Sequence, residues 1–210
     1  MNRAIVRLPG TDRTSGPEGT AAPPVRVAEP FTAVVFGATG DLTARKLVPA
    51  LFRLYRGGFF AAPFAVVGVG RRDKDDGRFR AELREAVRTA TGAEADWNRF
   101  AASVFYHRAD FTVAEDYAGL ARRLGEIDGR TGNPGNRLYY LATDPDYVPA
   151  VVERLAGAGL FAPGTAMPWT RAVVEKPFGR DLASALALDR HLLRFLREDQ
   201  LFRIDHYLGK

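Results

Sequence analysis

The sequence predicts an α/β fold with a doubly wound, mainly parallel sheet and helices on both faces. Short apolar runs recur from about residue 31, and each is followed by a stretch in which apolar residues have helical spacing. The apolar runs are nearly continuous, as expected for parallel strands that are buried on both faces. In such a sheet, ligands bind beyond the carboxyl ends of the strands.

The predicted elements follow one another in order along the chain. Strands are predicted at residues 32–36, 64–69, 104–107, 137–142, 172–174 and 201–204. Helices are predicted at residues 42–56, around 79–87, 96–102, from 112 to the Gly/Asn/Pro cluster at 129–136, from 145 to about 155, and from 182 to about 196. Their predicted N-terminal caps are a capping box of Thr112 with Glu115, then Asp144 before Pro145, and Asp181.

Composition divides the chain into two parts and limits its class. Residues 1–30 contain five prolines and three glycines without a periodic apolar pattern, which predicts a disordered arm, and residues 31–210 are expected to form the folded domain. Neither a signal peptide nor a membrane span is indicated, so we expect a cytoplasmic protein without membrane contact. The sequence has no cysteine and three scattered histidines, which gives no metal-ligand spacing.

The formal charge of +5 does not indicate nucleic-acid binding. The 30 basic and 25 acidic residues are interleaved along the chain, which is typical of a solvated surface rather than a basic face. Arginine accounts for nearly all the basic residues. The four exceptions are Lys46, Lys74, Lys176 and Lys210. Lysine carries a compact ammonium group and arginine a planar guanidinium group, so the positions of these few lysines can indicate functional sites.

A glycine turn joins the first predicted strand to the first predicted helix. Its sequence is Gly37-Ala38-Thr39-Gly40-Asp41-Leu42-Thr43. Glycine at 37 allows a sharp turn, and glycine at 40 lets the backbone approach a pyrophosphate at the positive end of a helix. The spacing is G-x-x-G rather than G-x-G-x-x-G, so an ordinary glycine turn is the alternative. The position between an apolar strand and an amphipathic helix favours dinucleotide binding.

Two arginines follow the second predicted strand, where an NAD-binding domain usually has a carboxylate. Arg71 and Arg72 suit a ribose 2′-phosphate, since a charge-assisted hydrogen bond contributes about 1.5 to 3 kcal/mol. The prediction is therefore NADP rather than NAD. The alternative is that both arginines are ordinary surface charges.

Two further groups of residues are predicted at the same sheet edge. Lys176-Pro177 follows the fifth strand, and a cis peptide bond there would fix a lysine that meets a phosphate or a substrate hydroxyl; a solvated turn is the alternative. The motif RIDHYLGK, residues 203–210, begins in the last predicted strand, and Asp205 and the residues after it would lie at the same sheet edge. Three of the four lysines would then lie around one cleft.

Four motifs carry a family resemblance. GATGDLTARKL (37–47), NRLYYLA (136–142), VVEKPFGRDL (173–182) and LREDQLFRIDHYLGK (196–210) resemble glucose-6-phosphate dehydrogenase, in the same order and at the family's spacing. The resemblance runs from about residue 31 to residue 210. It implies a Rossmann-like NADP-binding domain of an oxidoreductase that transfers hydride from C1 of glucose 6-phosphate to NADP in the pentose phosphate pathway, giving 6-phosphogluconolactone.

The resemblance also implies roles for matching residues. The coenzyme contacts would be Gly37, Ala38, Thr39, Gly40, Asp41, Leu42, Lys46, Arg71, Pro145 and Lys176. The substrate contacts would be Lys176, His206, Tyr207 and Lys210, and Asp205 would orient the general base. Asp144 departs from the family, which usually has proline there, so the contact at Pro145 is in doubt.

We expect the chain to be an incomplete enzyme. In the family the general-base histidine lies beyond the last motif, in a large C-terminal α+β domain that this sequence lacks. Loss of the base and pocket predicts coenzyme binding without useful turnover, and an exposed apolar docking face that favours self-association or a complementing chain. The alternatives are a non-catalytic nucleotide-binding module and one half of a split enzyme. A short-chain reductase is disfavoured, because Tyr207 and Lys210 are spaced Tyr-x-x-Lys rather than Tyr-x-x-x-Lys.

Overall fold

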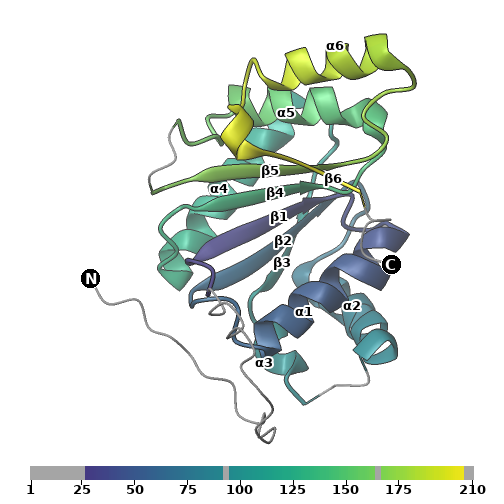
Figure 1. The fold of residues 1–210 in the computed structure, drawn as a ribbon. Coiled ribbons are helices and arrows are strands. Elements are labelled where there is room, and N and C mark those ends of the chain that lie inside the picture. Colours follow the sequence, from purple (N-terminus) through teal and green to yellow (C-terminus); the bar gives the residue numbers. More distant parts are fainter. Residues whose placement is uncertain (1–26, 92–94, 164–166, 206–210) are drawn as a thin grey trace, which may run out of the picture.

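The computed structural model describes residues 27–91, 95–163 and 167–205. In that part, a six-stranded parallel sheet has the order β3-β2-β1-β4-β5-β6 (Figure 1). The strands are β1 (Phe31–Phe36), β2 (Phe64–Gly70), β3 (Val104–Arg108), β4 (Arg137–Leu141), β5 (Thr170–Glu175) and β6 (Leu201–Ile204). This order confirms the predicted Rossmann-like doubly wound fold, with its switch point between β1 and β4.

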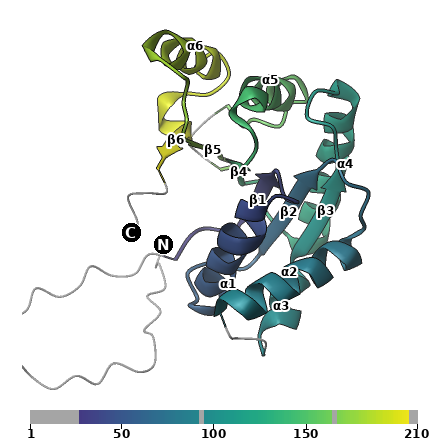
Figure 2. The ribbon, with the colours of Figure 1, turned by 90° about the vertical axis from the view of Figure 1, so that its right-hand side faces the viewer.

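Helices cover both faces of the sheet. They are α1 (Val48–Arg56), α2 (Asp76–Thr91), α3 (Trp97–Ala101), α4 (Ala114–Thr131), α5 (Val148–Gly157) and α6 (Leu182–Leu192). Two cores separate α4, α5 and α6 on one face from α1, α2 and α3 on the other (Figures 1 and 2). The predicted stripe of Phe79, Leu83 and Val87 on α2 is buried, because residues four apart lie on the same side of a helix. Each such side chain contributes about 1.5 to 3 kcal/mol when it leaves water.

The burial of the strands follows the sequence pattern. β1 and β2 are buried at every residue, as the continuous apolar runs predicted. β5 instead alternates: Ala172 and Val174 are buried, whereas Arg171 is exposed and Val173 is half-buried. The helix layer of α1, α2 and α3 therefore does not extend across the whole sheet. Phe202 of β6 pairs in register with Val173 and is 45% exposed.

The capping box predicted at Thr112 and Glu115 is wrong. The Asp110 carboxylate accepts hydrogen bonds from the backbone N–H and the hydroxyl of Thr112, at 2.9 and 2.7 Å. Because the hydroxyl is engaged there, the N-cap of α4 is Val113, whose side chain makes no capping bond. The local Asp110 turn competes with the helix cap and replaces it.

Three other boundaries differ from the predictions. α4 continues through Gly129 to Thr131, because Gly132 is the residue that takes a positive φ of 73° and ends the helix. α6 ends at Leu192 rather than near Leu196, where i to i−3 backbone bonds tighten the chain into turns. A π-helical segment, η1 (Thr43–Leu47), precedes α1 within the predicted first helix.

The folded part begins a few residues before the predicted boundary at residue 31. Ala28 forms an isolated parallel bridge with Phe60, and the Trp169 Nε1–H donates to a Glu29 carboxylate oxygen at 3.1 Å. The rest of the predicted arm, residues 1–26, lies outside the described residues. None of the helices in the described ranges has the length and apolar character needed to cross a membrane.

Candidate functional site

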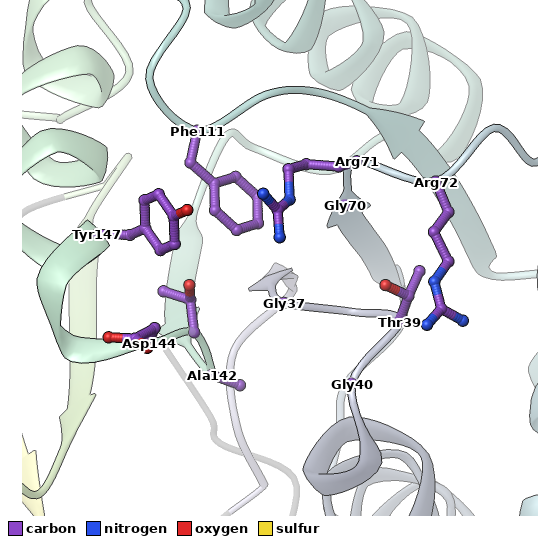
Figure 3. A pocket seen from close by; sticks show the side chains of 11 residues that line it. Gly37, Thr39, Gly40, Gly70, Arg71, Arg72, Phe111, Ala142, Asp144 and Tyr147 are labelled. Atoms are coloured by element: carbon purple, nitrogen blue, oxygen red, sulfur yellow. The ribbon is translucent and has the colours of Figure 1, made fainter.

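A cleft of about 310 Å³ lies at the carboxyl ends of β1, β2 and β4 (Figure 3). This is the switch point of the sheet, where the loops after β1 and β4 turn to opposite faces and leave a crevice between them. The lining residues are Gly37, Thr39, Gly40, Gly70, Arg71, Arg72, Phe111, Ala142, Thr143, Asp144 and Tyr147. The predicted glycine turn and arginine pair thus meet in one site.

The glycine turn depends on the absence of a side chain at Gly37. Its φ is +79°, and a Cβ placed there would lie 2.0 Å from the carbonyl oxygen of Ala142. The Gly40 N–H donates to the Gly37 carbonyl at 2.9 Å, and the Thr43 hydroxyl donates to the same oxygen at 3.2 Å. The turn is therefore closed by its own bonds, and the backbone of Ala142, directly after β4, lies against it.

Only part of the predicted coenzyme segment lines the cleft. Gly37, Thr39 and Gly40 do, whereas Ala38 is buried in the core. Asp41 is exposed and pairs with Arg45 at 3.4 Å, and Leu42 is half-buried at the start of η1. Neither belongs to the lining of the cleft.

Lys46 lies at a different hollow. That hollow has a volume of about 480 Å³ and lies between η1 and α2; its lining is Arg45, Lys46, Glu82, Glu85, Ala86, Thr89 and Ala90. Lys46 therefore does not line the cleft, and Lys210, which the sequence analysis also placed there, lies outside the described residues. Lys46 is exposed on η1 and lines the hollow beside α2, and it does not line the cleft that contains Arg71 and the glycine turn.

The two arginines occupy different places at the end of β2. The guanidinium carbon of Arg71 lies 5.7 Å from the centre of the Tyr147 ring, and Tyr147 meets Phe111 edge to face at 5.8 Å. Arg72 lies beside Thr39 (Figure 3). Its backbone carbonyl accepts a hydrogen bond from the Tyr106 hydroxyl at 2.8 Å. Burial raises the pKa of Tyr106, so this hydroxyl stays a donor.

Phe111 and Tyr147 were missed by the sequence analysis. Each is an aromatic residue shortly after the end of a strand, and this is the sequence signal that could have identified them. Asp144 also lines the cleft, and its carboxylate accepts the Asp146 N–H at 3.0 Å. It was predicted to cap the helix of Val148 and Val151, but it caps a separate 3₁₀ turn, and the N-cap of α5 is Tyr147. Pro145 begins the 3₁₀ turn η2 (Pro145–Tyr147) and is not among the lining residues.

Lys176 and Asp205 form an ion pair at the ends of β5 and β6. Lys176 Nζ lies 2.7 Å from Asp205 Oδ2, and the Lys176–Pro177 peptide bond is cis, as predicted. The Tyr140 hydroxyl donates to Glu175 at 2.5 Å beside this pair, and desolvation followed by that bond raises the Tyr140 pKa. Lys176 and Asp205 lie at the same sheet edge as the cleft, but neither residue lines it. His206, Tyr207 and Lys210 lie outside the described residues.

The two histidines within the described ranges each have a ring nitrogen next to a backbone carbonyl. His107 Nε2 lies 3.3 Å from the backbone carbonyl of Asp116, and burial lowers the pKa of His107. His191 Nε2 lies 3.2 Å from the Pro149 carbonyl, where α6 contacts α5. Neither ring contacts the cleft or the Lys176–Asp205 pair. The described residues contain no group of three or more His, Asp or Glu side chains suited to a metal ion.

Several large apolar side chains are exposed on α6, directly after it, and on β6. Leu182 is 75% exposed, and Leu186, Leu193 and Phe202 are also exposed. A hollow of about 260 Å³ between α6 and the strands is lined by Val174, Phe178, Ala185, Leu186, Leu188, Asp189, Leu192 and Arg203. The docking face that the sequence analysis expected, and the partner for it, stay predictions.

Comparison with known proteins shows a match over most of the chain. Residues 34–210 match the family model described as glucose-6-phosphate dehydrogenase, NAD binding domain. The glucose-6-phosphate 1-dehydrogenase of Chlamydia muridarum is 42% identical over 194 residues, which are 90% of this chain and 38% of that protein. That of Bacillus subtilis is 41% identical over 179 residues, 84% of this chain and 35% of the relative.

Solved structures show the same likeness. A glucose-6-phosphate dehydrogenase in complex with its substrate glucose-6-phosphate aligns with a TM-score of 0.76 and 33% identity, over 88% of this chain and 38% of that one. The enzyme from Mycobacterium avium aligns with a TM-score of 0.72 and 35% identity, over 85% of this chain and 36% of that one. The chain thus spans about 38% of the length of the relative most fully covered here.

Proposed function

Because this chain belongs to the glucose-6-phosphate dehydrogenase family, we propose that it is the NADP-binding part of an enzyme that oxidises glucose 6-phosphate. In this proposal hydride leaves C1 of the sugar and the product is 6-phosphogluconolactone. The coenzyme supplies the hydride acceptor. The residues of this chain bind and orient it at the cleft between β1 and β4.

The observation that supports this proposal is the meeting of the glycine turn with two arginines in one cleft. The lack of a Cβ at Gly37 and Gly40 leaves backbone accessible to a pyrophosphate. No carboxylate is among the lining residues contributed by the end of β2, where NAD-binding domains hold the ribose hydroxyls. Two positive charges favour a 2′-phosphate there, so NADP is preferred to NAD.

The proposed substrate side is the edge formed by β5 and β6. Lys176 would contact the substrate and the nicotinamide side of the coenzyme, and Asp205 would orient the general base. The Lys176–Asp205 ion pair supports this by fixing the ammonium at 2.7 Å from the carboxylate. His206, Tyr207 and Lys210 are proposed to hold the sugar phosphate, on the strength of the RIDHYLGK motif.

We also propose that the 210-residue chain binds coenzyme without useful turnover by itself. His107 and His191 contact backbone carbonyls and are unsuited to act as the base. A general base contributes about 10² to 10⁴ in rate, and positioning of the reacting carbon contributes more. A measurable but very slow reaction would agree with this proposal.

Titration calorimetry with NADP and NAD tests the coenzyme proposal. We expect NADP to bind about 10- to 150-fold more tightly than NAD, from one charge-assisted hydrogen bond to the 2′-phosphate. Absence of heat with both coenzymes would refute coenzyme binding. Protein purified from a host that lacks glucose-6-phosphate dehydrogenase tests turnover, and reduction of NADP at a rate typical of enzymes would refute the proposed inactivity.

A second candidate is a binding module or half of a split enzyme that pairs with another chain. The exposed apolar side chains of Leu182 and Leu186, four residues apart on α6, favour this alternative, because exposed apolar surface often marks an interaction site. Sedimentation velocity at several protein concentrations measures self-association. A strictly monomeric chain that gains no activity with a complementing domain would exclude the split enzyme.

A further inference from the structure

The two edges of the sheet differ in how their backbone groups are bound. β3 and β6 are the edge strands (Figure 2). On β3, the Tyr106 N–H donates to the Asp76 carboxylate at 2.7 Å. The Val104 carbonyl accepts a hydrogen bond from Arg80 Nε at 2.7 Å. Side chains of α2 therefore occupy these two outward-facing groups of β3, which protects that edge from pairing with another strand.

β6 has no such protection at Arg203. The Lys176 N–H donates to the Ile204 carbonyl at 3.3 Å, so the backbone groups of Ile204 face β5. Successive residues of a strand direct their backbone groups to opposite sides, and those of Arg203 therefore face away from the sheet. Within the part of the chain that the structure describes, the Arg203 N–H and carbonyl have no hydrogen-bond partner. The edge of β6 thus presents a free donor and a free acceptor on one residue.

A row of apolar side chains ends at this edge of the sheet. Tyr140, Val173 and Phe202 lie in register on β4, β5 and β6. Phe202 is exposed, and Val173 and Ile204 are half-buried, on the part of the sheet that α1, α2 and α3 do not cover. The row therefore stops at an exposed aromatic ring, next to the unpaired backbone groups of Arg203.

The Arg203 side chain lies on the other face of β6 and is bound within its own chain. It forms ion pairs with Asp189 of α6 and, at 2.7 Å, with Glu198. Arg203 lines the hollow between α6 and the strands, so its neighbours Phe202 and Ile204 face the opposite side of the sheet. The guanidinium therefore does not project from the strand edge, where a charge would oppose pairing with another strand.

We propose that β6 pairs antiparallel with β6 of a second copy of the chain, with Arg203 of one copy opposite Arg203 of the other. Each Arg203 then donates its N–H to the carbonyl of the other, as in a hydrogen-bonded pair of an antiparallel ladder. In this register Phe202 of each copy lies opposite Ile204 of the other, so each apolar side chain gains an apolar neighbour on the open face.

A second copy fits this edge because one strand supplies both halves of the pairing. The free donor meets the free acceptor, and the aromatic ring meets the aliphatic side chain, under a single two-fold axis. The pairing goes beyond the proposed coenzyme function and does not depend on it, since residues 201–204 do not line the cleft. Because the contact is one short strand, we expect a weak dimer that dissociates on dilution.

A single introduced cysteine reports the register, because the sequence has no cysteine of its own. In the proposed pairing the two Cα atoms at position 203 are about 5.5 Å apart, which a disulfide can span. The two Cα atoms at position 202 are diagonal neighbours, about 7 to 8 Å apart, which is too far. With oxidised glutathione, Arg203→Cys should form a disulfide-linked dimer in non-reducing electrophoresis, and Phe202→Cys, the matched control, should form several-fold less. Equal linking of the two variants would overturn the register.

Sedimentation equilibrium measures the strength of the pairing, over chain concentrations from about 1 μM to 1 mM. Proline lacks the N–H but is tolerated on an edge strand where the N–H faces solvent, so Arg203→Pro removes the two proposed hydrogen bonds. Arg203→Ala is the matched control, because it removes the same guanidinium and keeps the N–H. We expect Arg203→Pro to weaken the dimer by about 5- to 150-fold relative to Arg203→Ala, the loss of two hydrogen bonds.

Two lysine substitutions separate β6 from the exposed leucines of α6. Phe202→Lys removes the proposed cross-strand neighbour of Ile204 and adds a charge beside the strand edge, so it should weaken the dimer by at least several-fold. Leu182→Lys adds the same charge at a 75% exposed site on α6. It should change the dimer by less than about twofold, since exposed charges are screened by salt.

The outcomes distinguish the strand pairing from other contacts and from the coenzyme proposal. A native chain that stays monomeric at every concentration overturns the pairing, whether or not it binds coenzyme. If Leu182→Lys disrupts the dimer and Phe202→Lys does not, the copies meet through α6 and the pairing is wrong. Equal dimers of Arg203→Pro and Arg203→Ala would also contradict it. Circular dichroism shows whether each variant is folded, and if Arg203→Pro is not, the cysteine and lysine variants decide the outcome.

Discussion

Replacement of Gly37 by alanine tests the close approach that shapes the cleft. Gly37 combines two constraints: a φ of +79°, and backbone atoms of Ala142, the residue after β4, where a side chain would begin. The added Cβ would lie 2.0 Å from the Ala142 oxygen and 2.8 Å from the Ala142 carbonyl carbon. Both atoms belong to backbone, which cannot move aside as a flexible side chain can. The end of β4 must therefore shift.

The magnitude follows from separating these two constraints. A left-handed φ costs a non-glycine residue about 1 to 2 kcal/mol. Overpacking against a rigid neighbour adds about 1 to 3 kcal/mol, so Gly37→Ala should lower the free energy of unfolding by about 2 to 5 kcal/mol. Gly58 is the matched control, because its φ is +72° and no atom lies within 4 Å of the added Cβ. Gly58→Ala should cost only about 1 to 2 kcal/mol.

Urea unfolding followed by tryptophan fluorescence measures both variants. Trp97 and Trp169 are buried at 3% and 6% exposure, so unfolding changes their surroundings. We expect the midpoint for Gly37→Ala to fall well below that for Gly58→Ala, with equal denaturant slopes. Affinity for NADP should fall with Gly37→Ala and stay unchanged with Gly58→Ala, if the chain binds NADP as proposed. Equal destabilisation by the two substitutions would refute the argument that β4 requires glycine at this turn.

Three further outcomes are expected. Burial lowers the pKa of His107, so below about pH 6.5 the unfolded chain binds more protons than the folded chain. The free energy of unfolding should therefore decrease as the pH is lowered, and it should decrease more steeply in the native chain than in His107→Gln. Equal pH dependence of the two chains in urea unfolding would contradict this. Leu120→Ala, at a fully buried site, should cost about 2 to 5 kcal/mol, whereas Leu182→Ala, at a 75% exposed site, should stay within about 0.5 kcal/mol; similar midpoints for both would contradict the assigned core. Tyr140→Phe removes the donor to Glu175 and should cost about 1 to 3 kcal/mol in thermal or urea unfolding, and no change would show that water replaces the bond.

Ion pairs of Arg203 link β6 to α6 at the edge of the sheet. Arg203 of β6 binds both Asp189 of α6 and Glu198 before the strand, and hydrogen bonds to these carboxylates raise the Arg203 pKa. These bonds hold β6 in register at the sheet edge, next to the Lys176–Asp205 pair. The proposed substrate side therefore lies on a supported edge strand, beside the apolar surface of α6 that the chain leaves exposed.

The capping of α4 shows where local sequence patterns stop being sufficient. Thr112 and Glu115 have the spacing of a capping box, but Asp110 lies two residues earlier and binds the Thr112 hydroxyl first. Two local patterns competed for one side chain, and only the folded geometry shows which was formed. The capping box of Asp181 with Ser184 has no such competitor, and Asp181 caps α6 as predicted.

The sequence by itself determined the fold class, the order of the elements and the glycine turn, because these depend on short-range periodicity and on the conformational freedom of glycine. Tertiary structure alone decided which predicted residues share the cleft. Phe111 and Tyr147 enter it because the ends of separate strands meet at the switch point of the sheet, whereas Lys46, close to the turn in sequence, faces α2. Distances across a parallel sheet follow the spatial order of its strands, and that order is set by long-range packing rather than by neighbours in the chain.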